Sequence, residues 1–126
     1  MTDLIEVNEA LAELLAGVVS DVAVYAVLPE VTTPPLIVIG PGDPWVEFEG
    51  APFGRCRPRL AVTFIADRGT NDVRVGEVTD AVVAIMRAVN DSDDFMVTQV
   101  DQPGQVVLNG QAHLGASVLV LTEVYV

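Results

Sequence analysis

Lysine is absent from this chain of 126 residues, and its six basic residues are all arginines. Eighteen acidic residues oppose them, which gives a formal net charge of −12. Because phosphate binding needs a basic surface, this balance argues against a protein that wraps nucleic acid or docks on anionic lipid. A negative surface still suits a protein past which DNA must slide without sticking.

Cysteine and histidine each occur once, as Cys56 and His113. A lone cysteine forms no internal disulfide, and no cysteine and histidine spacing is present that would hold zinc. A catalytic histidine needs a nucleophile or an orienting acid nearby, and the sequence places no such motif around His113. We therefore interpret His113 as a strand or loop histidine with a local hydrogen bond, and we expect a reducing compartment.

Long apolar runs are also missing. The longest, at 22–29 and 34–39, fall far below the ~20 residues that a membrane-spanning helix needs. The N-terminal segment MTDLIEVNEA carries early acids and no positive region, so it does not have the pattern of a signal peptide. We expect a soluble protein that stays inside the cell after synthesis, at least at first, and has no contact with a membrane.

Apolar residues are abundant, at 51% of the chain. That proportion allows a core to form without disulfides or metal, and the length fits one domain spanning 1–126. Twenty-four of the residues are valines, which are stiff at χ1 and favour strands. We therefore expect a large β component.

Two segments have the three-and-four spacing of amphipathic helices. The first is 3–17, with Thr2 suited to cap its start and Gly17 suited to end it. Its predicted buried face is Leu4, Val7, Leu11, Leu14 and Val18. The second is about 72–89, whose predicted stripe is Val75, Val78, Val82, Ile85, Met86 and Val89.

The remaining apolar segments have the length and composition of strands. They are 22–28, 36–40, 45–49, 57–66, 95–101, 105–109 and 115–126. We predict a turn at 40–44 and an exposed loop at 50–54. The order of elements predicts an α+β fold, a mainly antiparallel sheet with two amphipathic helices packed on one face.

Two motifs that could bind ligands are incomplete. The glycine-rich Gly40–Gly42 segment lacks the GK[ST] of a P-loop and the third glycine of a dinucleotide fingerprint, so a turn is the better interpretation. Asp91, Asp93 and Asp94 resemble part of a calcium loop, but the loop glycine and the twelfth-position acid are missing. We predict no catalytic residue, no metal site and no cofactor, and hence a protein that is not an enzyme.

The acids of that turn follow the predicted second helix, at the negative end of its dipole. A positive partner surface, such as arginines of a neighbouring subunit, would relieve this repulsion.

Arg55, Arg57 and Arg59 form the densest positive cluster of the chain, and alternation places all three on one side of a strand. One interpretation is solvation with weak local ion pairing, worth ~0–1 kcal/mol per exposed pair. The other is a subunit contact, in which the arginines of one copy meet acids of the next. Trp45 and Phe48 are either core edge or interface anchors, and the enrichment of tryptophan and arginine at interface hot spots favours the interface.

Strand edges give a further hint of self-association. The segments 22–28 and 118–126 carry little charge and therefore have no obvious protection against edge pairing. In a ring, such edges can be matched around the circle.

The order of elements resembles a known family. An amphipathic first helix leads to a strand, the loop Leu28–Glu30 with its proline, and a second strand. An arginine-led strand (57–67), a helix carrying VGEVTDAVVAIM (75–86) and closing strands follow. This arrangement resembles the tail terminator proteins of long-tailed, siphovirus-type bacteriophages, especially those of actinobacterial hosts, over nearly the whole chain.

The resemblance implies a structural virion protein of the tail–neck region, present in the host cytoplasm before assembly. Its subunits would form a ring, typically a hexamer, that caps the tail tube, ends tube polymerisation and joins the tail to a head-side connector or stopper protein. DNA would pass the bore without specific binding. No family motif assigns individual residues, so Arg55, Arg57, Arg59 and Trp45 are interface predictions made from this sequence.

Two alternatives stay open. The chain is compatible with another phage neck or head–tail connector protein, although such proteins often have a small barrel or a helical fold. It is also compatible with an acidic binding module, for example a DNA mimic, which would be a stable monomer with its acids gathered on one face.

Overall fold

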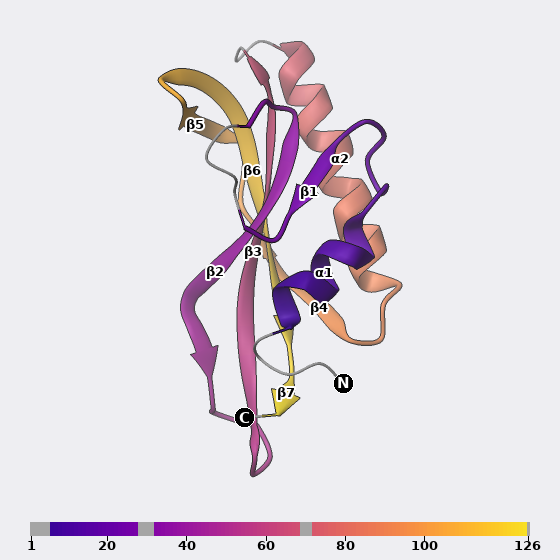
Figure 1. Ribbon diagram of the computed structural model, residues 1–126, viewed down its shortest axis with the longest axis vertical. Coiled ribbons are helices and arrows are strands. Elements are labelled where there is room, and N and C mark those ends of the chain that lie inside the picture. The colour runs from indigo at the N-terminus through magenta and orange to yellow at the C-terminus, as the bar shows by residue number, and fades with distance from the viewer. Residues whose placement is uncertain (1–5, 28–31, 69–71, 126) are drawn as a thin grey trace.

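The computed structural model describes residues 6–27, 32–68 and 72–125 of the chain (Figure 1). Its elements are α1 (Val7–Leu15), β1 (Ala23–Tyr25), β2 (Leu36–Glu47), β3 (Arg55–Arg68), α2 (Asp72–Asn90), β4 (Phe95–Val100), β5 (Gly104–Leu108), β6 (Gln111–Thr122) and β7 (Val124–Tyr125). The two helices and the mostly antiparallel sheet form an α+β fold, as the sequence predicted.

The sheet has the strand order β1-β2-β3-β6-β4, with β5 also on β6 and β7 also on β3. The pairing of β1 with β2 is parallel, and the pairings of the other strands are antiparallel. The two long strands β3 and β6 lie side by side at the centre (Figure 1). They form the scaffold on which the helices and the shorter strands are placed.

Both helices pack on the same face of the sheet, since their buried residues join strand residues in one cluster. The alternate β3 residues Cys56, Leu60, Val62, Phe64 and Ala66 belong to this cluster, because successive side chains of a strand alternate between faces. The helical contribution is Val7, Leu11, Leu15, Val78, Ala81, Val82, Ile85 and Val89.

The helix predictions are largely confirmed. In the first helix Val7 and Leu11 are buried, and the helix stops before Gly17, whose positive φ of 76° suits glycine. Thr2 and Leu4, the predicted cap and the first apolar position, lie outside the described residues. In α2 the buried stripe begins at Val78.

Val75 was wrongly predicted to belong to that stripe, and 42% of its surface is exposed. Only residues 69–71 separate β3 from α2, so the first turn of the helix lies at the end of that strand. There the sheet offers little surface to cover Val75.

The predicted turn at 40–44 is wrong, because the single strand β2 runs through it. The register between β2 and β3 shifts between Pro41 and Val46. The glycines and prolines of 40–44 therefore produce a bulge-like irregularity in the strand and not a turn. Prolines are tolerated here because β1 covers β2 only at 36–38. Beyond that, β2 is an edge strand, where a missing N–H need not break a ladder.

Gly42 lets β2 approach β3 closely at this irregularity. A Cβ at this position would lie 2.7 Å from Cβ of Arg59 and 3.1 Å from its carbonyl carbon and oxygen. Gly42 is therefore part of what holds β2 and β3 together past the body of the sheet, and it does not belong to a phosphate-binding loop.

The expectation that 118–126 offers an unprotected edge is wrong for 118–122, which belong to β6, whereas β7 pairs with β3 on one side. β6 pairs with β3 on one side and with β4 and β5 on the other, so it is internal to the sheet. The connection from β5 to β6 is a turn at Asn109 and Gly110, both with positive φ, as two-residue hairpins prefer. In the described part of the chain, no helix is long and apolar enough to cross a membrane.

Candidate functional site

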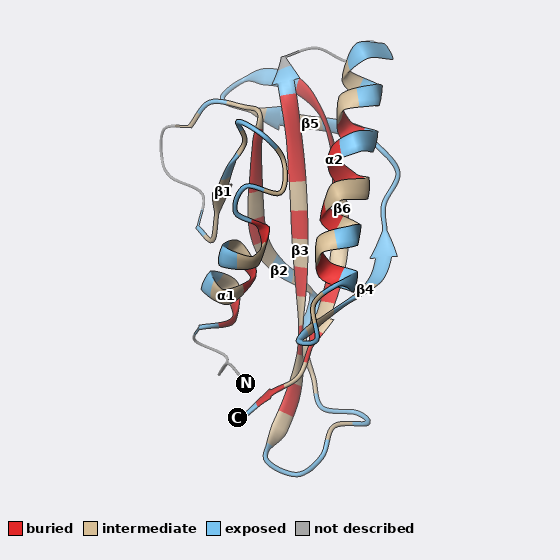
Figure 2. Ribbon diagram, turned by 90° about the vertical axis from the view of Figure 1, so that its right-hand side faces the viewer, coloured by how far each residue is buried: buried red, intermediate tan, exposed pale blue. Residues whose placement is uncertain are grey.

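One exposed part of the molecule is the hairpin formed by the end of β2, the loop 48–54 and the start of β3. Figure 2 shows it at the lower end of the molecule, beyond both helices. The loop is internally bonded: the amide of Ala51 donates to Phe48 O at 3.0 Å, and the amide of Arg55 donates to Pro52 O at 3.1 Å. We call 41–59 the hairpin arm, and these hydrogen bonds join residues of its loop to one another.

The three predicted arginines lie along one side of this arm. Arg55, Arg57 and Arg59 alternate with Cys56 and Pro58, which are buried. Each arginine has an acidic partner within the chain. The N–O distances are 3.0 Å for Arg55–Glu123, 3.5 Å for Arg57–Glu123 and 3.5 Å for Arg59–Glu47.

Further contacts fix the root of the arm. Arg55 donates from Nη2 to the hydroxyl of Tyr125 at 3.1 Å, and its guanidinium lies 4.7 Å from the centre of that ring. The hydrogen bond to Glu123 raises the pKa of the Arg55 guanidinium above its ordinary value. Arg57 donates to the carbonyl oxygen of Gly50 at 3.0 Å, which ties the loop to the strand.

The arginine cluster therefore has a role within the chain. Local ion pairing accounts for its charge, and a contact with a second copy stays a prediction. All three side chains remain partly exposed, with 30–35% of their surface accessible, so they can still take part in an interface.

Aromatic side chains gather on the same arm. Trp45 is 50% exposed, Phe48 is 62% exposed and Phe53 is fully exposed at 108%. Tyr125, 52% exposed, lies at the root of the arm through its contacts with Arg55. These are four of the seven aromatic residues of the chain.

Sequence reasoning singled out Trp45 and Phe48 but missed Phe53 and Tyr125. Phe53 lies in the segment 50–54, which was correctly predicted to be an exposed loop. An aromatic residue inside a predicted exposed loop was the available signal. For Tyr125 the sequence offered none, because only the pairing of β7 with the start of β3 brings it there.

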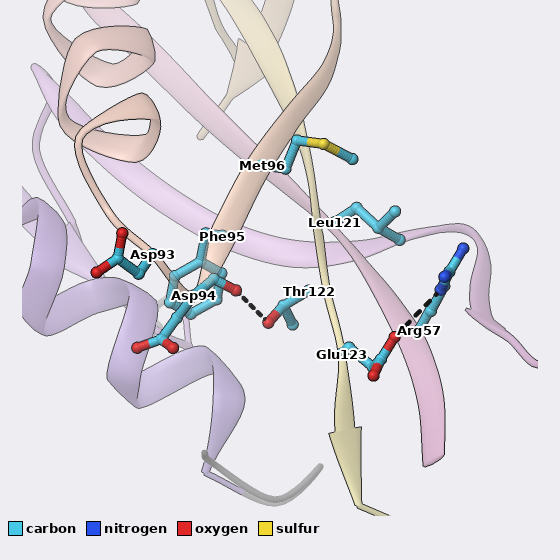
Figure 3. Close-up of a pocket in the computed structure, with 8 residues that line it drawn as sticks. All are labelled: Arg57, Asp93, Asp94, Phe95, Met96, Leu121, Thr122 and Glu123. Carbon is cyan, nitrogen blue, oxygen red and sulfur yellow. Dashed lines mark hydrogen bonds and ion pairs between the residues drawn. The ribbon is translucent and has the colours of Figure 1, made fainter. Parts of the chain in front are cut away.

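A hollow of about 260 Å³ adjoins the arm (Figure 3). It is lined on one side by Arg57 and Glu123, and on another by Asp93 and Asp94 from the turn after α2. The hydroxyl of Thr122 donates to the carbonyl oxygen of Asp94. Arg57 lines the same hollow as these acids, but its ion pair is with Glu123, so a positive partner for the acids stays a prediction.

The two rare residues have structural roles. His113 is buried on β6 and its Nδ1 lies 3.0 Å from the carbonyl oxygen of Ala66, so Nδ1–H donates to it. This contact confirms the interpretation of His113 as a strand histidine with a local hydrogen bond. Cys56 is a buried free thiol, and burial raises its pKa. Within the described ranges, no group of three or more His, Cys, Asp or Glu could hold a metal ion.

A scan against protein-family models finds none that matches the chain, and a search of curated proteins finds no significant relative. The functional conclusion therefore rests on the surface described above and on the resemblance in the order of elements.

Proposed function

We propose that this chain is a structural subunit that assembles into a ring, and that the ring acts as a tail terminator of a long-tailed phage. In that role it caps the tail tube, ends tube polymerisation and joins the tail to a head-side connector. The observation that carries the proposal is the hairpin arm, which exposes Trp45, Phe48 and Phe53 to solvent. Large aromatic side chains exposed together mark contact surfaces, and in particular hot spots.

The distribution of acidic residues supports the same role. Exposed acids occur on α1 (Glu9, Glu13), on α2 (Asp72, Asp80) and in the turn after α2. Whichever of these surfaces lines a bore, it repels the phosphate backbone and lets DNA slide. Because α1 and α2 cover the same face of the sheet, these acids also fit a DNA mimic, and the oligomeric state of the purified protein distinguishes a mimic from a ring subunit.

Another neck or head–tail connector protein remains the second candidate. The exposed aromatic arm favours assembly in either case. The two candidates differ in which end of the junction the ring binds, and this difference is measurable.

The test is the mass of the purified protein together with negative-stain images, alone and mixed with isolated tail tubes. We expect rings in solution, or density at tube ends with tube growth halted. Binding to head-side particles without binding to tubes would replace the terminator by a connector. A monomer that binds neither would overturn the proposal.

A further inference from the structure

A second apolar feature lies away from the hairpin arm. A groove of about 330 Å³ runs between α2 and the segment that joins β4 to β5. Its walls are mainly apolar, with Val82, Val83 and Met86 on the helix and Val100 and Pro103 opposite them. We call it the α2 groove.

We infer that the arm of one copy inserts its aromatic tip, Phe48 and Phe53, into the α2 groove of the next copy. This inference rests on the proposed function, since it specifies the contact that builds the ring. Both surfaces are apolar, and burying them against each other removes large aromatic side chains from water.

The geometry of the two surfaces selects the kind of assembly. The tip and the groove are different parts of the same chain, so their contact is heterologous and leaves a free tip and a free groove at the two ends. Heterologous contacts produce a closed ring when the rotation between copies closes, and a filament when it does not. A contact of tip with tip would instead stop at a dimer.

The charge of the arm is compatible with this apolar contact. The arm carries three of the six arginines of the chain, Arg55, Arg57 and Arg59. Among the residues that line the α2 groove, the one charged side chain is the acid Asp101. Asp43, Glu47 and Glu49 offset these arginines, so the arm has no net charge and a second acidic copy would repel it less than it repels the rest of the molecule.

The test uses two variants that each disable one surface. Phe48→Ser with Phe53→Ser removes the tip, and both positions are exposed loop positions. Thr79→Trp fills the groove from an exposed position of α2. Val107→Ser is the control, since it removes an exposed apolar side chain of β5 that belongs to neither surface.

Sedimentation velocity over a concentration series measures the assembly. We expect each disabled variant to raise the dissociation constant about 30-fold or more, which is the change expected when one hot-spot side chain is removed from an interface. Val107→Ser should leave the dissociation constant unchanged. An equimolar mixture of the two disabled variants should form a heterodimer and nothing larger. In that pair, the intact tip of one copy fills the intact groove of the other.

Several results would overturn the inference. The first is an equimolar mixture of the disabled variants that stays monomeric. The second is a Thr79→Trp variant that assembles as the wild type does. The third is a wild-type chain that forms no oligomer, either alone or when mixed with tail tubes. Tube capping is scored separately. If wild-type rings cap tubes but the mixture forms no heterodimer, the inference fails and the proposed function stands. If the heterodimer forms but wild type caps no tube, the proposed function fails and the inference stands.

Discussion

At the scale of single residues, Glu123 organises the base of the hairpin arm. Its two carboxylate oxygens face Arg55 and Arg57, one arginine each. Both arginines then reach further, Arg55 to Tyr125 and Arg57 to the backbone of Gly50. One acid therefore connects the start of β3, the loop tip and the end of the chain. Partial exposure limits each of these pairs to at most ~1 kcal/mol, so the cluster sets the orientation of the arm more than it stabilises the fold.

Reversing charge on the arm tests whether the arginines also face a second copy. We expect Arg57→Glu with Arg59→Glu to weaken assembly by about tenfold or more, because the changes give the arm a net negative charge, which Asp101 of the groove and the acidic neighbouring copy repel. Sedimentation velocity and virion infectivity measure the effect. Unchanged assembly and infectivity would show that the arginines act only within the chain.

A matched control separates local charge from net charge. Arg59→Glu and Arg74→Glu each change the net charge by the same amount and each remove one ion pair, but Arg74 lies in the first turn of α2, before the residues that line the groove. If both weaken assembly equally, the effect comes from overall repulsion, and the contact assigned to the arm is wrong.

At the scale of elements, β2 is the strand that the sequence pattern did not predict correctly. The alternation of β3 and the stripe of α2 were predictable because both elements pack directly on the core, so burial imposes a period on their side chains. The segment 40–44 was misread because glycine and proline mark turns in most contexts. On an edge strand, glycine and proline are compatible with strand pairing. Tertiary contacts decide which strand lies at an edge, so the sequence of 40–44 alone could not show that it continues a strand.

Gly42 offers a test of this element. Gly42→Ala places a methyl group against Cβ and the carbonyl group of Arg59, so we expect a loss of about 1–3 kcal/mol in the free energy of unfolding. Urea denaturation measures it. Gly40→Ala is the matched control, since a Cβ there meets nothing within 4 Å, and its effect should stay within about 0.5 kcal/mol. Equal losses in the two variants would contradict the close approach.

The candidate site was predictable in part for a related reason. Arg55, Arg57 and Arg59 share a face because strand alternation is a local rule. Glu123, the partner of Arg55 and Arg57, lies 66 or more residues away in the sequence and reaches them only through the pairing of β3 with β6 and β7. The α2 groove likewise joins α2 to a connection that follows β4, so no local pattern could reveal it.

At the scale of the whole molecule, apolar attraction and charge repulsion oppose each other. Every copy carries a formal net charge of −12, and assembly brings such copies together. The inferred contact is centred on aromatic side chains, which salt does not screen. Long-range repulsion is screened, and the two effects can therefore be separated by ionic strength.

We expect assembly to strengthen as sodium chloride rises from about 0.01 M to about 0.3 M, over which the Debye length falls from ~30 Å to below ~10 Å. Sedimentation velocity at several salt concentrations measures the change. Assembly that weakens steadily over this range would show that arginine–acid pairs dominate the contact, and the aromatic tip would lose its central role.

The pairing of β7 with the first residues of β3 has a practical consequence for handling the protein. Any affinity tag or fluorescent fusion attached after residue 126 leaves the polypeptide beside the base of the hairpin arm, where it would obstruct neighbouring copies. The Asn109–Gly110 turn is a better insertion point, because Figure 1 shows β5 and this turn at the opposite end of the molecule. A peptide epitope inserted there would report on the assembled particle while leaving the arm unhindered.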